Sequence, residues 1–329
     1  MFVFGYDIIV TMIRDFYKWN EKQFSKGFDA SVVLQRGEED FLGSGKGKKM
    51  IIRLGQDIYH IKEPHSRYYK NNKSEFGTSG TMMDNELATI TELMAERRYR
   101  SFHLPYAYYE LLRGDKGGFK LISKSINNDK IEVKSLSELM HYEDDFISEH
   151  ALKFSMQNLE EILTKPAICL RVMTRDCYDQ YVKFLLASVF DFSTDDHFNN
   201  IIFVRNQNSM LFESMFLCDK ESNVFNPLIA REFSMDEILR HSNSYNHYVG
   251  IKISDRDEDF EKRVSVLLRL IKKGIMPKKY VKFLSDLAGF DFDAVARDVK
   301  GDFGLVADDR QLDIYKRTAE IAGEISQKG

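Results

Sequence analysis

A polar stretch separates two apolar runs in the middle of the chain. The segment DFSTDDHFNNIIFV covers residues 191–204 and places Asp195 and Asn200 five positions apart. Asp219 follows in MFLCDKE, after a sequence that reads as a β-hairpin. Because a hairpin returns the chain to the end at which it started, we expect Asp219 to lie close to Asn200. Carboxylate and amide oxygens are ligands that Mg²⁺ prefers, usually together with substrate phosphates.

The Asp195 carboxylate is the member of this group that is left free to act on a proton. A carboxylate beside the phosphates can accept the proton of an attacking hydroxyl group. An Asp and an Asn five positions apart, followed by a second, metal-binding Asp, form the arrangement used for phosphoryl transfer. The pattern therefore predicts Asp195 as the base, with Asn200 and Asp219 as the Mg²⁺ ligands.

The same chemistry needs groups that hold a nucleotide triphosphate, and segments suited to this task come earlier in the chain in the expected order. FLGSGKGKKMII is rich in glycine and reads as a hairpin over the phosphates. YHIKEP places Lys62 on the next strand, and NELATI places Glu86 on a helix as the partner of that lysine. Backbone groups of LISKSI are candidates for contacts with adenine. The predicted nucleotide-binding residues are Gly43, Ser44, Gly45, Lys46, Gly47, Lys62, Glu86, Ser123, Lys124 and Ser125.

The elements that must position these residues begin with a region of short strands. The segments with the composition of strands are 31–35, 50–54, 57–62, 107–113 and 118–126. Residues 83–99 have apolar side chains at helical spacing, with Asp84 or Asn85 as the N-cap. The polar stretch 65–81 fits neither the helical nor the strand period.

From about residue 134 the pattern becomes helical, apart from the hairpin after residue 200. Residues 167–190 read as one long buried helix, and the segments 256–274, 277–289, 292–299 and 310–326 read as further helices. The sequence therefore predicts an α+β, two-lobed fold. We expect an N-terminal extension at 1–35, a small β-rich lobe at 36–126 and a larger, mainly helical lobe at 127–329.

The motifs together are similar to those of a known family. The run GSGKGKKMIIRLGQDIYHIKEP, followed by NELATI, STDDHFNNIIF and FLCDKE, resembles the HipA-like serine/threonine protein kinases, and in length and layout the CtkA-type members. Their catalytic loop has the pattern T-D-R-H-x-x-N, which here reads Thr194-Asp195-Asp196-His197-Phe198-Asn199-Asn200. The resemblance implies a two-lobed protein-kinase-like fold, ATP and Mg²⁺ as cofactors, and transfer of the γ-phosphoryl group to a protein Ser or Thr.

The resemblance also implies roles for individual residues. Lys62 would hold the α- and β-phosphates, and Asp195 would be the catalytic base. His197 lies two positions after that base, where many protein kinases place a lysine that contacts phosphate. Ser44, in the glycine-rich segment, would be a site of autophosphorylation.

Two departures from the family pattern leave other functions open. Asp196 stands where relatives often have Arg, and the segment after Asp219 is Lys-Glu-Ser, without a glycine. A catalytically weak nucleotide-binding or interaction protein is therefore one alternative. A kinase that acts on small molecules is another.

Composition restricts the classes of partner. The chain has 329 residues, 43% of them hydrophobic and 30% charged, which is typical of a folded soluble protein. Its 47 basic and 51 acidic residues give a net charge of −4, which does not favour direct nucleic-acid binding. The three cysteines match no zinc spacing and favour a reducing compartment.

No apolar stretch has the length of a membrane span, and the N-terminal segment lacks the features of a signal peptide. We therefore expect a cytoplasmic protein, or an effector that is exported without a conventional signal peptide. The expected partners are ATP and a protein substrate. The resemblance adds either a DNA-binding, antitoxin-like protein or a host protein.

Overall fold

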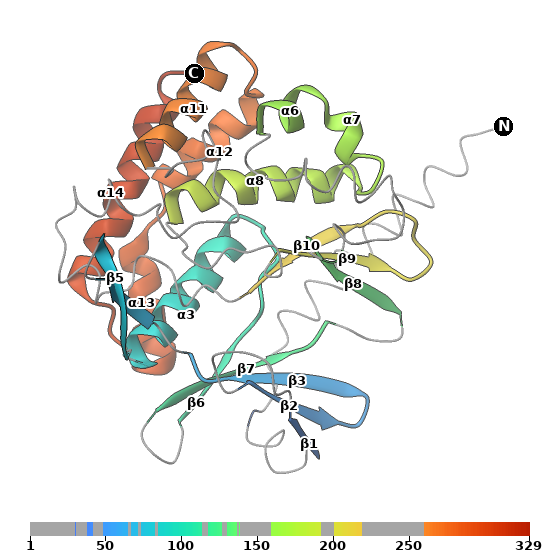
Figure 1. The fold of residues 1–329 in the computed structure, drawn as a ribbon, viewed down its shortest axis with the longest axis vertical. Helices are drawn as coiled ribbons and strands as arrows, with labels where there is room; N and C mark the ends of the chain where they lie inside the picture. The colour runs from blue at the N-terminus through green and yellow to red at the C-terminus, as the bar shows by residue number, and fades with distance from the viewer. Residues whose placement is uncertain are drawn as a thin grey trace.

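The computed structural model describes residues 30, 38–41, 49–64, 67–71, 74–82, 85–113, 118–126, 130–136, 138, 159–191, 201–218 and 260–329. A small antiparallel sheet lies at one end of the molecule and a larger helical part at the other (Figure 1). Helix α3 (Asn85–Ser101) lies between them. This arrangement confirms the α+β, two-lobed fold that the sequence predicts.

The small lobe is a five-stranded antiparallel sheet with the strand order β1-β2-β3-β7-β6. Its strands are β1 (Glu38–Phe41), β2 (Lys49–Leu54), β3 (Asp57–Lys62), β6 (Glu110–Arg113) and β7 (Phe119–Lys124). A two-residue turn joins β2 to β3, and Gly55 in that turn has a φ of +64°, a conformation that glycine adopts without steric cost. Lys62 is the last residue of β3 and pairs with Lys49 on one side and Leu121 on the other.

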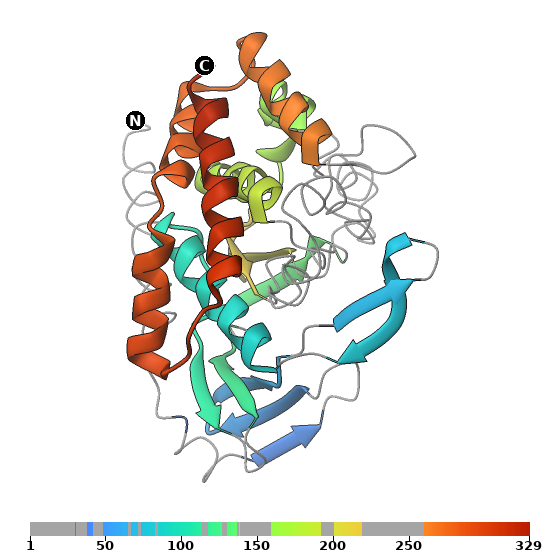
Figure 2. The ribbon, with the colours of Figure 1, turned by 90° about the vertical axis from the view of Figure 1, so that its left-hand side faces the viewer.

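A separate two-stranded ribbon follows the small sheet in the chain. Strands β4 (Arg67–Asn71) and β5 (Ser74–Met82) pair only with each other among the described strands, and the ribbon stands away from the helices (Figure 2). The sequence prediction of an irregular segment at 65–81 is wrong for these residues. The sequence of these strands has no regular alternation of apolar and polar residues, so the strand period is not visible in it.

Helix α3 is fastened to the sheet at its first residue. The side-chain amide of Asn85 donates to the carbonyl oxygens of Pro64 at 2.9 Å and Phe119 at 3.0 Å. Its oxygen accepts a hydrogen bond from the backbone N–H of Phe119. Asn85 is therefore a helical residue whose side chain joins α3 to the ends of β3 and β7, and it does not serve as the N-cap that the sequence suggested.

Helix α3 is buried along most of its length. The sheet lies at one end of it, and the C-terminal helices α13 (Phe292–Phe303) and α14 (Asp309–Ser326) lie beside it (Figure 2). Gln311 of α14 donates to the hydroxyl of Thr91 at 2.9 Å in a buried contact. The guanidinium of Arg98 lies over the ring of Phe292 at 5.2 Å. The C-terminal helices therefore help to fix the position of α3.

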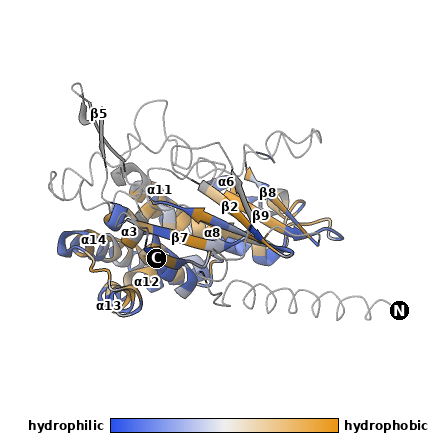
Figure 3. Ribbon diagram, turned by 90° about the horizontal axis from the view of Figure 1, so that it is seen from below, coloured by the Kyte–Doolittle hydropathy of each residue, from blue (hydrophilic) through white to orange (hydrophobic). Residues whose placement is uncertain are grey.

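The C-terminal helices have the amphipathic spacing that the sequence predicts. In α12 (Lys278–Ala288) the buried residues are Tyr280, Phe283, Leu284 and Leu287, at the i, i+3, i+4 and i+7 positions of one face. Hydrophobic and hydrophilic residues accordingly mix along α12, α13 and α14 (Figure 3). Helix α11 (Phe260–Lys272) completes this part of the chain. None of the described helices is both long and apolar enough to cross a membrane.

The predicted long helix at 167–190 is two helices. A short helix, α7 (Pro166–Cys169), follows α6 (Leu159–Thr164), and α8 (Arg175–Asp191) begins after a turn. In that turn the backbone of Thr174 donates to Phe212 at 2.8 Å, and Phe212 donates to Val172 at 2.9 Å. The hydroxyl of Thr174 accepts from the N–H of Cys177 at 3.3 Å, which is an N-cap contact. Pairing with a distant strand segment thus interrupts the helix.

The helical lobe contains a three-stranded antiparallel sheet with the order β10-β9-β8. The hairpin of β9 (Ile201–Asn206) and β10 (Ser214–Leu217) confirms the predicted one, and its register pairs Ile201 with Leu217. Strand β8 (Ile131–Ser135) is not among the predicted strands and lies within the lobe expected to be mainly helical. It forms by a pairing with β9 that is distant in the sequence, with Val133 opposite Val204.

Candidate functional site

The ammonium group of Lys62 forms a buried ion pair at the junction of the sheet and α3. Its Nζ lies 3.2 Å from Oε2 of Glu92, and the two side chains are 9% and 0% exposed. The same Nζ lies 5.1 Å from the centre of the Tyr109 ring. Burial of an ammonium group costs several kcal/mol unless an opposite charge compensates it (about 3–5 kcal/mol when one partner of a buried pair is removed). Glu92 therefore anchors Lys62 at the end of β3.

The partner of Lys62 in the structure is Glu92, which corrects the choice of Glu86 made from the sequence. Glu86 lies in the first turn of α3 and its side chain is exposed. Six residues along a helix correspond to about 9 Å of rise and a different face. Glu92 lies on the face that meets β3, so it reaches the lysine. An acid in the first turn of a helix is favoured by the helix dipole, and Glu86 has this position.

A tyrosine hydroxyl occupies the other oxygen of the Glu92 carboxylate. The Oη of Tyr106 donates to Oε1 of Glu92 at 2.9 Å in a buried contact, while Oε2 faces Lys62. Burial raises the pKa of Tyr106 well above its ordinary value, and the charge of Glu92 raises this pKa further. The hydroxyl therefore stays protonated and acts as a donor. Each oxygen of the carboxylate has its own fixed partner.

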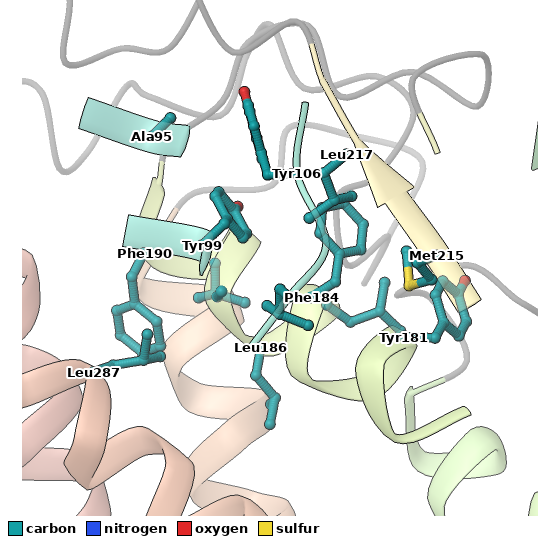
Figure 4. Close-up of a cluster of buried hydrophobic side chains, with 14 of the residues drawn as sticks. Ala95, Tyr99, Tyr106, Tyr181, Phe184, Leu186, Phe190, Met215, Leu217 and Leu287 are labelled. Atoms are coloured by element: carbon teal, nitrogen blue, oxygen red, sulfur yellow. The ribbon is translucent and has the colours of Figure 1, made fainter. Parts of the chain in front are cut away.

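Tyr106 also connects this pair to the end of strand β10. The N–H of Ala107 donates to the carbonyl of Leu217 at 2.9 Å, and the N–H of Leu217 donates to the carbonyl of Pro105 at 3.0 Å. Figure 4 shows Tyr106, Tyr99 and Leu217 in one group of buried side chains. Asp219 is the second residue after Leu217 in the sequence. The strand that leads to the predicted metal ligand is thus bonded to the segment that holds Glu92.

A second buried acid lies one turn further along α3. Glu96 accepts a hydrogen bond from Nη1 of Arg100 at 2.8 Å, and its side chain is 4% exposed. Burial raises the pKa of Glu96 to about 7, although Arg100 and Arg97 oppose the shift and Glu92 adds to it. The buried face of α3 therefore carries two carboxylates one turn apart, of which only Glu92 is paired with Lys62 in the described contacts.

The three residues predicted to contact adenine lie on or directly after β7. Ser123 pairs with His60 of β3, and Lys124 pairs with Tyr59 and forms an ion pair with Asp57 at 2.8 Å. The N–H of Ser125 donates to the carbonyl of Ile58 at 2.7 Å. This N–H belongs to the sheet, so an adenine contact through it would require the loss of that hydrogen bond.

The remaining predicted site residues lie outside the described residues. These are Gly43, Ser44, Gly45, Lys46, Gly47, Asp195, His197, Asn200 and Asp219. The described elements next to them are α8, which ends at Asp191, β9, which begins at Ile201, and β10, which ends at Leu217. Within the part of the chain that the structure describes, no group of three or more His, Cys, Asp or Glu side chains is placed to hold a metal ion.

Comparison with known proteins gives a result at the level of structure. No protein-family model matches the sequence, and no curated protein matches it. The crystal structure of CtkA, a proinflammatory kinase of Helicobacter pylori, matches this structure with a TM-score of 0.57 at 12% sequence identity, over 88% of this chain and 96% of that one. The chain has a protein-kinase-like fold.

A second similar structure is HipA of Shewanella oneidensis MR-1, solved with HipB and its operator DNA. It has a TM-score of 0.46 at 9% identity and covers 91% of this chain and 70% of HipA. The match to CtkA confirms, for the fold, the resemblance to HipA-like kinases that the motifs indicate. At these identities the comparisons establish the fold alone.

Sequence reasoning missed three residues around the ammonium group of Lys62: Glu92, Tyr106 and Tyr109. One signal for Glu92 was present, since it stands in ATITELMAE, an acid inside a largely apolar run of the helix. Buried acids are almost always paired, so this position was a candidate for the partner of a lysine. No comparable signal marks Tyr106, because its contact depends on how the segment after α3 folds back against the helix.

Proposed function

We propose that this chain is an ATP- and Mg²⁺-dependent serine/threonine protein kinase that transfers the γ-phosphoryl group of ATP to a protein hydroxyl. The observation that carries the proposal is the buried Lys62–Glu92 pair at the junction of the sheet and α3, within a protein-kinase-like fold. In protein kinases a strand lysine and a helix glutamate form this ion pair, and the lysine holds the phosphates of ATP.

The described contacts explain how Lys62 would act. Glu92 and the ring of Tyr109 hold its ammonium group at a fixed place at the end of β3. A cation that is already positioned stabilises the charge of the phosphates without reorganisation during the reaction. The role of Lys62 in this proposal is therefore to bind and orient the α- and β-phosphates.

The other roles rest on the sequence, and the register of the hairpin supports them. Asn200 directly precedes β9, Asp219 follows β10 by two residues, and the ends of these strands pair through Ile201 and Leu217. We propose Asn200 and Asp219 as the Mg²⁺ ligands, since their oxygen donors suit this ion, which would neutralise phosphate charge. Asp195 would accept the proton of the acceptor hydroxyl.

The glycine-rich segment and the partners complete the proposal. Gly43, Gly45 and Gly47 would let the backbone approach the phosphates, and Ser44 would be modified by the kinase itself. His197 would contact the phosphates. The substrate would be a protein, and the further partner either an antitoxin-like DNA-binding protein or a host protein.

The test is incubation of the purified protein with γ-labelled ATP and Mg²⁺, with and without a generic protein acceptor. We expect label on the protein or the acceptor, and at least about a hundredfold loss in Lys62→Met and Asp195→Ala, as is usual when a charge-stabilising group is removed. Lys282→Met is the matched control, because the side chain of Lys282 is 75% exposed on α12 and pairs only with Asp286 among the described contacts. This variant should keep full activity.

Three results would contradict the proposal in different ways. The absence of label on any protein, with no thermal shift by Mg-ATP, would refute nucleotide use altogether. A thermal shift without transfer would favour a nucleotide-binding protein that lacks catalysis. Label on a small-molecule acceptor, such as an aminoglycoside, but on no protein would favour a small-molecule kinase.

A further inference from the structure

A buried carboxylate with one partner is not fixed by that partner alone. The side chain of Glu92 has three rotatable bonds, and its Oε2 lies 3.2 Å from Nζ of Lys62. The hydroxyl of Tyr106 occupies Oε1 at 2.9 Å, so two donors in different directions hold the carboxylate. Because the side chain of Glu92 is 0% exposed, bulk water cannot replace either donor. Tyr106 therefore determines the direction in which Glu92 presents its charge to Lys62.

Aromatic contacts hold the hydroxyl of Tyr106 in place. Its ring stacks on Tyr99 of α3, with centroids 5.7 Å apart and an angle of 21° between the planes. It also meets the edge of Tyr109 at 6.3 Å, and Tyr109 lies 5.1 Å from the Nζ of Lys62. These tyrosines thus contact both members of the ion pair and the helix that carries Glu92. Figure 4 shows Tyr106 and Tyr99 of this group among the buried side chains.

The backbone around Tyr106 connects this group to β10. Tyr106 and Leu217 form a parallel bridge, with hydrogen bonds of 2.9 and 3.0 Å between Ala107, Leu217 and Pro105. A displacement of β10 would therefore move the residue that orients Glu92. The strand that leads to Asp219 and the ion pair of Lys62 share one rigid connection.

From these contacts we propose that Tyr106 is a positioning residue of the phosphate-binding site. Its hydroxyl orients Glu92 toward Lys62, and its backbone keeps this pair in register with the end of β10. The inference rests on the proposed kinase function, because the position of Lys62 matters there for phosphoryl transfer.

Tyr106→Phe is the direct test, since it removes the hydroxyl and keeps the ring that stacks on Tyr99. A hydrogen bond to a charged group corresponds to about a tenfold to hundredfold effect, so we expect kcat/KM for Mg-ATP to fall by about this factor. The fall should appear mainly in kcat, because a misdirected lysine affects the transition state more than ATP binding. A purely structural role would lower the melting temperature and leave the kcat of the folded protein unchanged.

Tyr178→Phe is the matched control. The hydroxyl of Tyr178 is also buried and donates at 2.9 Å, but to the backbone carbonyl of Ile162 in the helical lobe. This variant loses the same chemical group at a comparable depth, and its kcat should stay within about twofold of the unmodified protein. Equal losses of kcat in Tyr106→Phe and Tyr178→Phe would overturn the proposal.

A double-mutant cycle tests whether Tyr106 acts through Glu92. When Glu92→Gln has already disrupted the ion pair, the addition of Tyr106→Phe should reduce the remaining activity by less than about twofold. A further tenfold loss would show that Tyr106 acts independently of Glu92 and would overturn the proposal.

The same cycle in urea unfolding, without nucleotide, separates this inference from the proposed function. We expect Tyr106→Phe to shift the urea midpoint less in the Glu92→Gln background than in the unmodified protein. If this difference in urea midpoints is found and Tyr106→Phe transfers phosphate at the normal rate, only the positioning role of Tyr106 is refuted. If the difference is found but the unmodified protein transfers no phosphate, the kinase function is refuted, and the positioning role with it. The hydrogen bond between Tyr106 and Glu92 would be supported in both cases.

Discussion

Removal of the charge of Glu92 should destabilise the protein more than removal of any exposed acid on the same helix. Glu92→Gln keeps the size of the side chain and removes the negative charge that lies beside the buried ammonium group of Lys62. At the observed 3.2 Å, two unit charges attract by about 5 kcal/mol if the effective dielectric constant is about 20. Measured losses for one partner of a buried pair are about 3–5 kcal/mol.

Urea unfolding followed by circular dichroism measures this loss. With a slope of about 3 kcal/mol per molar urea, a loss of 3–5 kcal/mol lowers the midpoint by about 1 M or more. Glu86→Gln is the matched control, because it changes the exposed acid of the first turn of α3 in the same way. At this exposed position the helix dipole contributes about 0.3–1 kcal/mol, which corresponds to a shift of about 0.3 M or less in the urea midpoint.

The double variant Lys62→Met/Glu92→Gln tests the cause of the loss. Replacement of both partners of a buried ion pair by uncharged groups is often neutral or stabilising. The double variant should therefore recover most of the midpoint that Glu92→Gln loses. An equal fall of the midpoint in Glu86→Gln and Glu92→Gln would refute the ion pair as the cause of the loss. So would a double variant whose midpoint is lower than that of Glu92→Gln by the whole shift that Lys62→Met causes alone.

Two further predictions concern α3. The pKa of Glu96 is raised from 4.5 to about 7 by burial, so the folded protein keeps a proton that the unfolded chain releases in this window. The free energy of unfolding should therefore fall by about 3 kcal/mol as the pH rises from about 4.5 to 7. In Glu96→Gln, whose side chain can still accept from Arg100, the urea midpoint should change less between pH 5 and pH 8 than in the unmodified protein. An equal change in both proteins would contradict Glu96 as the source of the pH dependence. Asn85→Ala removes three hydrogen bonds between α3 and the sheet lobe, and should lower the free energy of unfolding by about 2–4 kcal/mol. Asn85→Asp keeps the acceptor for Phe119 but places a carboxylate oxygen against the carbonyl oxygens of Pro64 and Phe119, so it should lose at least as much stability as Asn85→Ala. Full stability of Asn85→Asp would exclude the two hydrogen bonds that the amide donates as the cause.

The parts of the fold that depend on neighbouring residues could be predicted from the sequence. Strands β2 and β3 combine strand-forming residues with a turn at Gly55, which needs no distant contact. The apolar spacing of α12 gives its buried face directly. The β9–β10 hairpin is also local, which is why its pairing was predicted correctly.

The parts that depend on distant contacts could not be predicted. Strand β8 forms because it pairs with β9. The helix predicted at 167–190 is interrupted before α8, where the backbone of Val172 and Thr174 pairs with Phe212. The strands β4 and β5 show no apolar period in the sequence, and they form by pairing with each other. In each case the sequence permits several local structures, and a partner elsewhere in the chain selects one.

The candidate site also combines features that the local sequence predicts with contacts that depend on distant segments. The local sequence is enough to predict that Lys62 ends a strand, that a helix with acids follows, and that polar residues border the β9–β10 hairpin. The contact of Lys62 with Glu92, and the hydrogen bond of Tyr106 to the other carboxylate oxygen, follow from the packing of distant segments. A helix can carry acids on every face, and the acid that meets Lys62 depends on which face of α3 lies toward the sheet. That packing is set by Asn85 and by the C-terminal helices, whose contacts with α3 the local sequence does not reveal.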